Sequence, residues 1–171
     1  MDTEDRIGVD AIRVRIPIGA MGELDSGYIF GEDFDFDQSG FFLRSQLNAV
    51  ETDLSLLLLG FRESLLTGFD IARAIGGAGF WLETAYVFYS VFDDDKIDKA
   101  KDYLRASVGL DYSFSRRTYE FIEYHFSQAG AKKIEDYLAN LTQPAYVNGS
   151  VYLLARHYFA PGFTYQITLP L

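Results

Sequence analysis

Two carboxylates and an imidazole lie close together in the sequence, at Glu120, Glu123 and His125. Such a set could support general acid and base chemistry, which requires titratable groups that reach one substrate. In an extended segment Glu123 and His125 point to the same face, but no residue nearby supplies a nucleophile. We therefore expect no catalytic residue and no enzymatic activity.

Aspartates gather in two polar stretches, where their oxygens could bind a hard cation such as Ca²⁺. The first contains Asp33, Asp35 and Asp37, and the second contains Asp93, Asp94, Asp95 and Asp98. The first lacks the EF-hand pattern, because Gln38 stands where the turn glycine belongs and Arg44 where the bidentate glutamate belongs. The chain has no Cys and only two His. We expect no metal site and no cofactor, and interpret both stretches as solvated acidic loops.

Most other candidate residues are charged side chains that alternate with apolar ones. The basic members are Arg13, Arg15, Arg44, Arg105 and Arg156, and the others are Asp25, Asp70, Glu83, Asp111, Glu123 and His125. Alternation with a period of two is typical of β-strands, in which successive side chains point to opposite faces. The pattern predicts that these side chains share one face of a sheet.

The longest alternating segment runs from Tyr103 to Phe114. Twelve residues at about 3.3 Å each extend about 40 Å, and a tilt of about 40° leaves about 30 Å of height, close to the hydrocarbon thickness of a bilayer. Its apolar face ends in Tyr112 and Phe114, and aromatic side chains are enriched where lipid meets headgroup. These features predict a transmembrane β-barrel.

Further alternating segments predict about nine strands in all, or ten if Pro161-Gly162 divides the last region. They lie near 12–18, 24–30, 41–49, 54–58, 69–71, 80–88, 122–126 and 151–168. Short connections near 20, 51, 77 and 116 alternate with longer ones at 31–39, about 62–67, 90–102 and 127–146. Outer-membrane barrels show this asymmetry, with short periplasmic turns and long extracellular loops. We expect an all-β, antiparallel, up-and-down barrel of about 8–10 strands.

The composition limits the alternatives. With 171 residues, a single β-barrel domain over 1–171 is expected. The formal net charge of −10 repels phosphates and excludes a nucleic-acid partner. All five lysines (Lys96, Lys99, Lys101, Lys132, Lys133) fall in the two longest predicted loops, so the polar strand faces do not resemble a solvated outer surface.

Two segments suggest helix. Over Ala131 to Leu141, apolar residues recur at helical spacing opposite charged ones, which predicts a short helix in the longest loop. This helix could fold over the barrel mouth, or the loop could pack on itself. The leucines of Leu54 to Leu66 suit either a strand or a buried helix, and this alternative stays open.

The hairpin Asp102–Phe114 and Tyr119–Phe126, with Tyr152–Tyr158 and Tyr165–Thr168, resembles strands of porin-like outer-membrane proteins of Gram-negative bacteria. The resemblance implies an address in the bacterial outer membrane, contact with lipid bilayer or detergent, and contact with lipopolysaccharide and small solutes or ions. The acidic N-terminus lacks a signal sequence and the C-terminus lacks a terminal aromatic residue. We interpret the chain as an excised or engineered segment of a larger barrel.

The charged strand faces would then line the lumen. If the chain closes alone, the interior is narrow and Arg–carboxylate pairs form a plug; within a larger barrel, the same rows would line a passive pore. Asp111 and Glu123 are expected close together, with Arg105 or Arg156 nearby. The alternative is a soluble, lipocalin-like barrel with an apolar interior that binds an apolar ligand.

Overall fold

The computed structural model describes residues 10–31, 35, 38–61, 63–92 and 98–167. Five aspartates of the two acidic loops lie outside the described residues: Asp33, Asp37, Asp93, Asp94 and Asp95. The first nine and last four residues of the chain lie outside them as well. The predictions for these positions therefore stay predictions.

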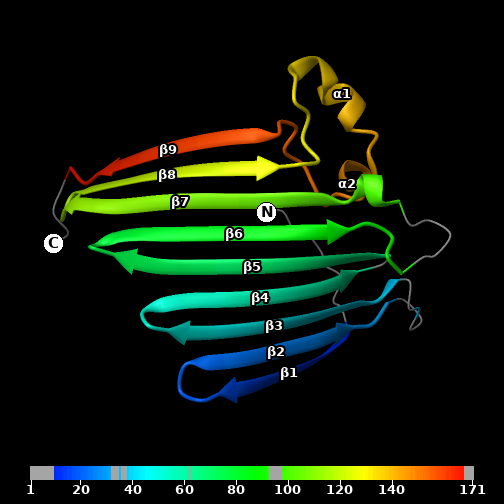
Figure 1. Ribbon diagram of the computed structural model, residues 1–171, viewed down its shortest axis with the longest axis horizontal. Helices are drawn as coiled ribbons and strands as arrows, with labels where there is room; N and C mark the ends of the chain where they lie inside the picture. The colour runs from blue at the N-terminus through cyan, green and yellow to red at the C-terminus, as the bar shows by residue number, and fades with distance from the viewer. Residues whose placement is uncertain (1–9, 32–34, 36–37, 62, 93–97, 168–171) are drawn as a thin grey trace, which may run out of the picture.

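The described chain forms one antiparallel sheet of nine strands, ordered as in the sequence (Figure 1). The strands are β1 (Ala11–Ile18), β2 (Gly22–Ile29), β3 (Gly40–Ala49), β4 (Thr52–Phe61), β5 (Ser64–Ile75), β6 (Ala78–Phe88), β7 (Tyr103–Ser115), β8 (Thr118–Ser127) and β9 (His157–Tyr165). The predicted all-β class, up-and-down order and strand number are confirmed.

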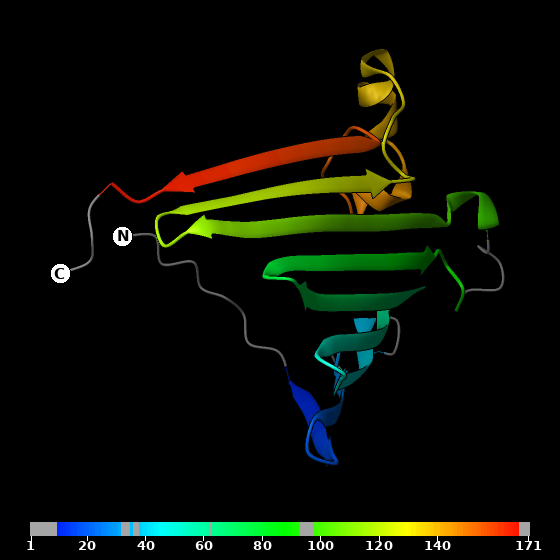
Figure 2. The ribbon, with the colours of Figure 1, turned by 60° about the vertical axis from the view of Figure 1, so that its left-hand side comes forward.

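The sheet is open, with β1 and β9 as its two edges (Figures 1 and 2). The predicted closed barrel is thus not formed by these nine strands. Strand direction supplies a physical reason: every neighbouring pair is antiparallel, so the first and ninth strands run the same way. Direct closure would require a parallel pair between them, which breaks the hydrogen-bonding pattern of the rest of the sheet.

Short turns alternate with longer connections, as predicted, with one exception. The turns after β1, β3, β5 and β7 are two or three residues long, whereas β2–β3, β6–β7 and β8–β9 have longer connections. Only two residues separate β4 from β5, so the predicted longer connection at 62–67 is wrong. The helical alternative for Leu54 to Leu66 is also wrong, because these residues lie mainly in β4 and the start of β5.

Pro161 does not divide the last strand, because its ring nitrogen faces the open edge. The amide of Gln166 donates to the carbonyl of Arg117 at 2.8 Å, so the even-numbered residues of β9 bond to β8. Pro161 is odd-numbered and costs no bond within the sheet. Proline is tolerated in this way on edge strands.

The long connection between β8 and β9 carries the helical turns η4 (Ile134–Asp136), α1 (Tyr137–Asn140) and α2 (Pro144–Val147), while η3 (Lys99–Lys101) precedes β7. The predicted short helix at Ala131 to Leu141 is confirmed in its C-terminal part by the four residues of α1, which follow the 3₁₀ turn η4. Figures 1 and 2 show α1 standing away from the end of the sheet. Within the described residues no helix has the length and apolar character to cross a membrane.

A small buried cluster lies where this connection meets the sheet. Val87 and Tyr103, at the adjoining ends of β6 and β7, pack with Ala129, Ala145 and Val151 from the connection. The connection therefore packs on the sheet at its long-connection end. The rest of the sheet has no second layer within the described residues, and its side chains depend on their cross-strand neighbours.

Candidate functional site

The two faces of the sheet differ sharply in chemistry. One face, here called the apolar face, carries exposed aliphatic and aromatic side chains from edge to edge. Examples from β1, β3, β4, β5, β7, β8 and β9 are Ile12, Val14, Ile16, Leu43, Leu47, Leu56, Leu58, Phe69, Val108, Leu110, Ile122, Phe159 and Phe163. Exposed apolar area on this scale far exceeds the patches that monomeric soluble proteins usually show.

Charge on the apolar face is confined to one end. Within the described strands, Arg73 and Glu120 are its only Asp, Glu, Lys or Arg side chains, and both lie toward the short-turn end. Aromatic pairs flank the aliphatic middle at both ends, with Tyr112 against Phe114 at the short-turn end and Tyr86 against Phe88 at the other. The face therefore has an aliphatic band between aromatic and polar margins.

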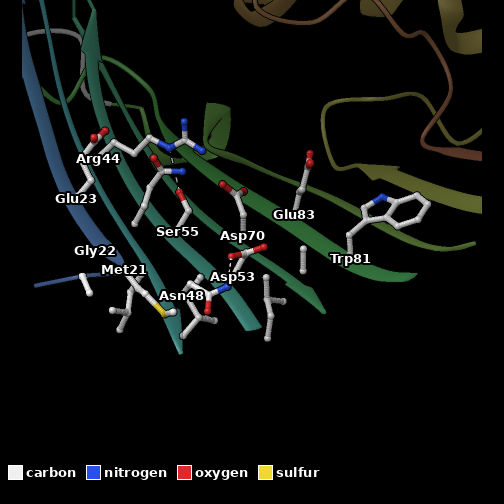
Figure 3. Close-up of a pocket in the computed structure, with 16 residues that line it drawn as sticks. Met21, Gly22, Glu23, Arg44, Asn48, Asp53, Ser55, Asp70, Trp81 and Glu83 are labelled. Atoms are coloured by element: carbon white, nitrogen blue, oxygen red, sulfur yellow. Dashed lines mark hydrogen bonds between the residues drawn. The ribbon is translucent and has the colours of Figure 1, made fainter. Parts of the chain in front are cut away.

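The opposite face, here called the polar face, carries a row of polar side chains across the sheet. Register brings Asp25 opposite Arg44, Asp70 opposite Glu83 and Ser107 opposite His125, with Ser55 between Arg44 and Asp70 along the row. Figure 3 shows Arg44, Ser55, Asp70 and Glu83 standing on the same side of the sheet. These residues line a hollow of about 540 Å³. Arg44, Asp70 and Glu83 thus share one face of the sheet, as their alternation with apolar residues predicted.

The charges near β1 pair with one another. The Arg13 guanidinium donates two hydrogen bonds to the carboxylate of Asp25, the first from Nε at 2.8 Å. Arg15 lies 3.3 Å from a carboxylate oxygen of Glu23 and 3.7 Å from Asp25. Asp25 itself is buried, with 6 % of its surface exposed, so several arginines compensate one enclosed carboxylate.

The acidic residues farther along the polar face have no such partners. Within the described residues Asp70, Glu83, Asp111 and Glu123 form no ion pair. Register places Asp70 and Glu83 directly opposite each other and brings Asp111 and Glu123 into diagonal positions on one face. Like charges so arranged repel unless water screens them, so this half of the face attracts cations.

The arginines that were expected beside Asp111 and Glu123 make other contacts. Arg105 donates to the carbonyl of Ser150 at 3.3 Å, and Arg156 donates to the carbonyls of Gly130 and Gln128, each at 3.0 Å. The expected ion pairs are therefore not formed. Arg105 thus ties the 128–156 connection to β7, and Arg156 ties the two ends of that connection to each other.

His125 has a hydroxyl neighbour that the sequence did not reveal. Ser107 Oγ lies 2.8 Å from Nδ1 of His125, across a pair of β7 and β8. A serine beside an imidazole is the start of a nucleophile and base arrangement, but within the described residues no carboxylate hydrogen-bonds to the imidazole to orient it. The described residues also contain no group of three or more His, Asp or Glu placed to hold a metal ion.

The 128–156 connection is tied together by polar contacts of its own. Asn140 donates to the carbonyl of Ala129 at 2.8 Å, and the Tyr146 hydroxyl donates to the carbonyl of Leu153 at 2.8 Å. Burial raises the pKa of Tyr146 above its ordinary value. Ile134 and Leu138 are each 80 % exposed, so the apolar side of the predicted helix does not pack on the sheet.

Sequence reasoning missed the residues whose roles depend on the connection. Tyr103 and Val87 were assigned to strands, and Leu66 to a connection or to the segment left open between strand and helix. None of them was assigned to a cluster beneath a loop, and Ser150 was not considered. The sequence did carry one indication of this cluster. Leu57, Leu59 and Leu66 are apolar residues on the polar face, and they lie toward its long-connection end.

Comparison of the chain with protein-family models, with curated protein sequences and with solved structures found no match. The function is therefore inferred from the two faces of the sheet and their contacts.

Proposed function

We propose that this chain forms part of the wall of an outer-membrane β-barrel, with the apolar face against lipid and the polar face lining a water-filled lumen. The barrel has a structural or passive-pore role and no catalytic one. The observation that carries the proposal is the edge-to-edge contrast between the two faces, with charge on the apolar face confined to its short-turn end.

Dimensions support the proposal. On β7 the apolar face runs from Leu104 to Phe114, ten steps in the sequence. At about 3.3 Å per step and a tilt of about 40°, the height is about 25 Å, which matches the apolar band of outer-membrane barrels. The aromatic pairs at both ends of the face fit the two interfaces of a bilayer.

The soluble alternative, a lipocalin-like barrel, needs its apolar side chains on the enclosed face. Along β4 the polar-face residue Ser55 is buried, whereas its apolar-face neighbour Leu56 is 58 % exposed. This pattern favours apolar side chains directed outward, as lipid contact requires.

The test compares neighbouring residues on opposite faces of β4. Trp81 is the only tryptophan, so Trp81→Phe removes all tryptophan fluorescence from the background protein. In that background Leu56→Trp reports on the apolar face and Leu57→Trp on the polar face at the same depth. After refolding into phosphatidylcholine vesicles, lipids brominated on their acyl chains are expected to quench Leu56→Trp strongly and Leu57→Trp weakly.

Equal fluorescence of Leu56→Trp with and without brominated lipid, in protein that stays outside the vesicles, would refute the membrane proposal. Strong quenching of both variants would refute the assignment of the polar face to a lumen. Circular dichroism of each variant checks that the sheet has formed.

A further inference from the structure

The two open edges of the sheet have a fixed relation that limits how a barrel can be completed. β1 and β9 are separated by eight antiparallel pairings, so they run in the same direction, as their arrows in Figure 1 show. An all-antiparallel closure has an even number of strands. Nine strands therefore need an odd number of further strands between the two edges.

The hydrogen-bonding groups that these edges offer can be read from the register. The amide of Phe30 donates to the carbonyl of Asp10 at 2.9 Å, so even-numbered residues of β1 bond to β2. Ala11, Arg13 and Arg15 thus direct their amides to the open side, and Pro17 has none to offer. On β9 the outward amides are those of His157, Phe159, Phe163 and Tyr165, on either side of Pro161.

The edge strands keep the two-faced pattern of the interior strands. Ile12, Val14 and Ile16 continue the apolar face to one edge, and Phe159 and Phe163 continue it to the other. Neither strand carries the lysines that usually protect a solvent-exposed edge. In lipid, unpaired edge amides and carbonyls are costly, so pairing of both edges would stabilise the membrane-bound sheet.

We propose that a partner polypeptide segment with an odd number of antiparallel strands pairs with both β1 and β9 and completes the barrel. Its strands alternate apolar and polar residues, because the apolar face must continue past Ile12 and Phe159. The inference rests on the proposed membrane function, since an open edge is tolerated in water.

Copies of this chain do not meet these requirements. Rotation about a barrel axis preserves strand direction, so β9 of one copy would meet β1 of the next in parallel. A two-fold axis in the membrane plane would pair β1 with β1 antiparallel, but it would place the 128–156 connections on opposite sides of the bilayer. A different segment satisfies both direction and orientation.

The first test uses the absence of Cys in the chain. Val14→Cys with Phe159→Cys places one thiol on each edge, both on the apolar face, and Leu43→Cys with Leu58→Cys places two directly opposite each other on β3 and β4. With a flexible bismaleimide in vesicles, the β3–β4 control pair is expected to cross-link within one chain. The edge pair is expected to stay unlinked. A cross-link within one chain would overturn the proposal by showing self-closure, and an intermolecular cross-link would overturn it by showing a ring of copies.

The second test asks whether a free edge accepts an antiparallel strand. The probe is a synthetic peptide with the sequence of β8, Thr118–Ser127. On the edge of β8 that faces β7, and on the open edge of β9, the outward amides belong to residues whose side chains lie on the apolar face. The peptide can therefore pair antiparallel with β9 and continue the apolar face. Adding the peptide is expected to slow hydrogen exchange at the amides of Phe159 and Phe163 by about tenfold or more, as pairing protects them. A peptide with Tyr124→Pro is the matched control, because even-numbered residues of β8 direct their amides to this edge.

Unchanged exchange with the β8 peptide would overturn the inference that β9 accepts a strand. The two proposals fail separately. Loss of lipid quenching at Leu56→Trp counts against the membrane function, whereas normal quenching combined with cross-linked edges counts against the partner segment alone.

Discussion

At the scale of single residues, Asp25 is the most constrained charge of the polar face. It is buried beside Arg13 and Arg15 and lies opposite Arg44. Asp25→Asn removes the negative charge, so Arg13 and Arg15 lose their common partner, and the positive charges of these two residues and Arg44 repel one another. We expect a lower urea midpoint for Asp25→Asn than for Glu23→Gln, the matched control, whose ion pair is with Arg15. Equal midpoints would contradict the central role of Asp25.

The unpaired acidic residues predict a local negative potential that a reactive thiol can report. Ala72→Cys lies opposite Asp53 and two residues from Asp70 on the polar face. A cationic methanethiosulfonate reagent is expected to modify it about threefold or more faster than an anionic one at low salt, with the difference reduced at high salt. The bias should disappear when Asp53→Asn and Asp70→Asn are added.

Ser45→Cys on the apolar face of β3 is the control for this reaction. In vesicles it should react slowly with both charged reagents because lipid excludes them. An anionic preference at Ala72→Cys would contradict the proposed cation attraction.

At the scale of elements, the β3–β4 turn holds two ordinary residues in a backbone conformation that favours glycine. Val50 has φ 53° and Glu51 φ 58°, whereas the equivalent β5–β6 turn uses Gly76 and Gly77. A β-branched residue at positive φ is strained. Val50→Asn with Glu51→Gly is therefore expected to raise the free energy of unfolding by about 1–2 kcal/mol.

The measurement is urea unfolding followed by circular dichroism. The same Asn-Gly replacement at Arg116 and Arg117, where neither φ is positive, is the control and should not stabilise the protein. A similar gain at both turns would show that the backbone strain at Val50 is not the cause.

The connection over the end of the sheet predicts a pH dependence. Burial raises the pKa of Tyr146, so the folded connection favours the neutral hydroxyl that donates to Leu153. The stabilisation is fully present below the ordinary tyrosine pKa of about 10 and is lost as pH rises through the raised value. A spin label at Asn148→Cys should become more mobile in that range.

Tyr146→Phe lacks the titrating group and should show a smaller change in label mobility over the same pH range. An identical alkaline transition in Tyr146→Phe would assign the change to another group. The variant also lacks the bond to Leu153, so its label should be somewhat more mobile at neutral pH.

The strands were predictable because alternation is local, and Arg13, Asp70, Glu83 and His125 were thereby assigned to one face. The contacts of the arginines expected beside Asp111 and Glu123 were not predictable, because Arg105 donates to Ser150 and Arg156 to Gly130, each more than twenty residues away in sequence. The Leu54 to Leu66 segment was ambiguous because β4 has leucines on both faces. Its apolar residues on the polar face approach the cluster beneath the connection.

At the scale of the whole molecule, the open sheet explains why alternation alone could not predict closure. The alternation within a strand shows which residues share a face, but the sequence of an edge strand does not show which strand pairs with its open side. Because all eight pairings are antiparallel and the number of strands is odd, β1 and β9 run in the same direction. Edge pairing and strand parity are therefore properties of the sheet and not of any one segment.

The position of the bilayer on the molecule follows from the distribution of charge on the apolar face. Leu56 lies in the aliphatic band, whereas Ile75 lies near Arg73 at the short-turn end. Arg at the midplane of a barrel's lipid face costs about 2–4 kcal/mol, and near the interface about 0–1 kcal/mol. Leu56→Arg should therefore reduce folding into vesicles far more than Ile75→Arg, as measured by urea titration of the lipid-bound protein. Equal costs at both positions would contradict a bilayer centred on the aliphatic band, and a negligible cost at Leu56 would indicate that this face does not contact lipid.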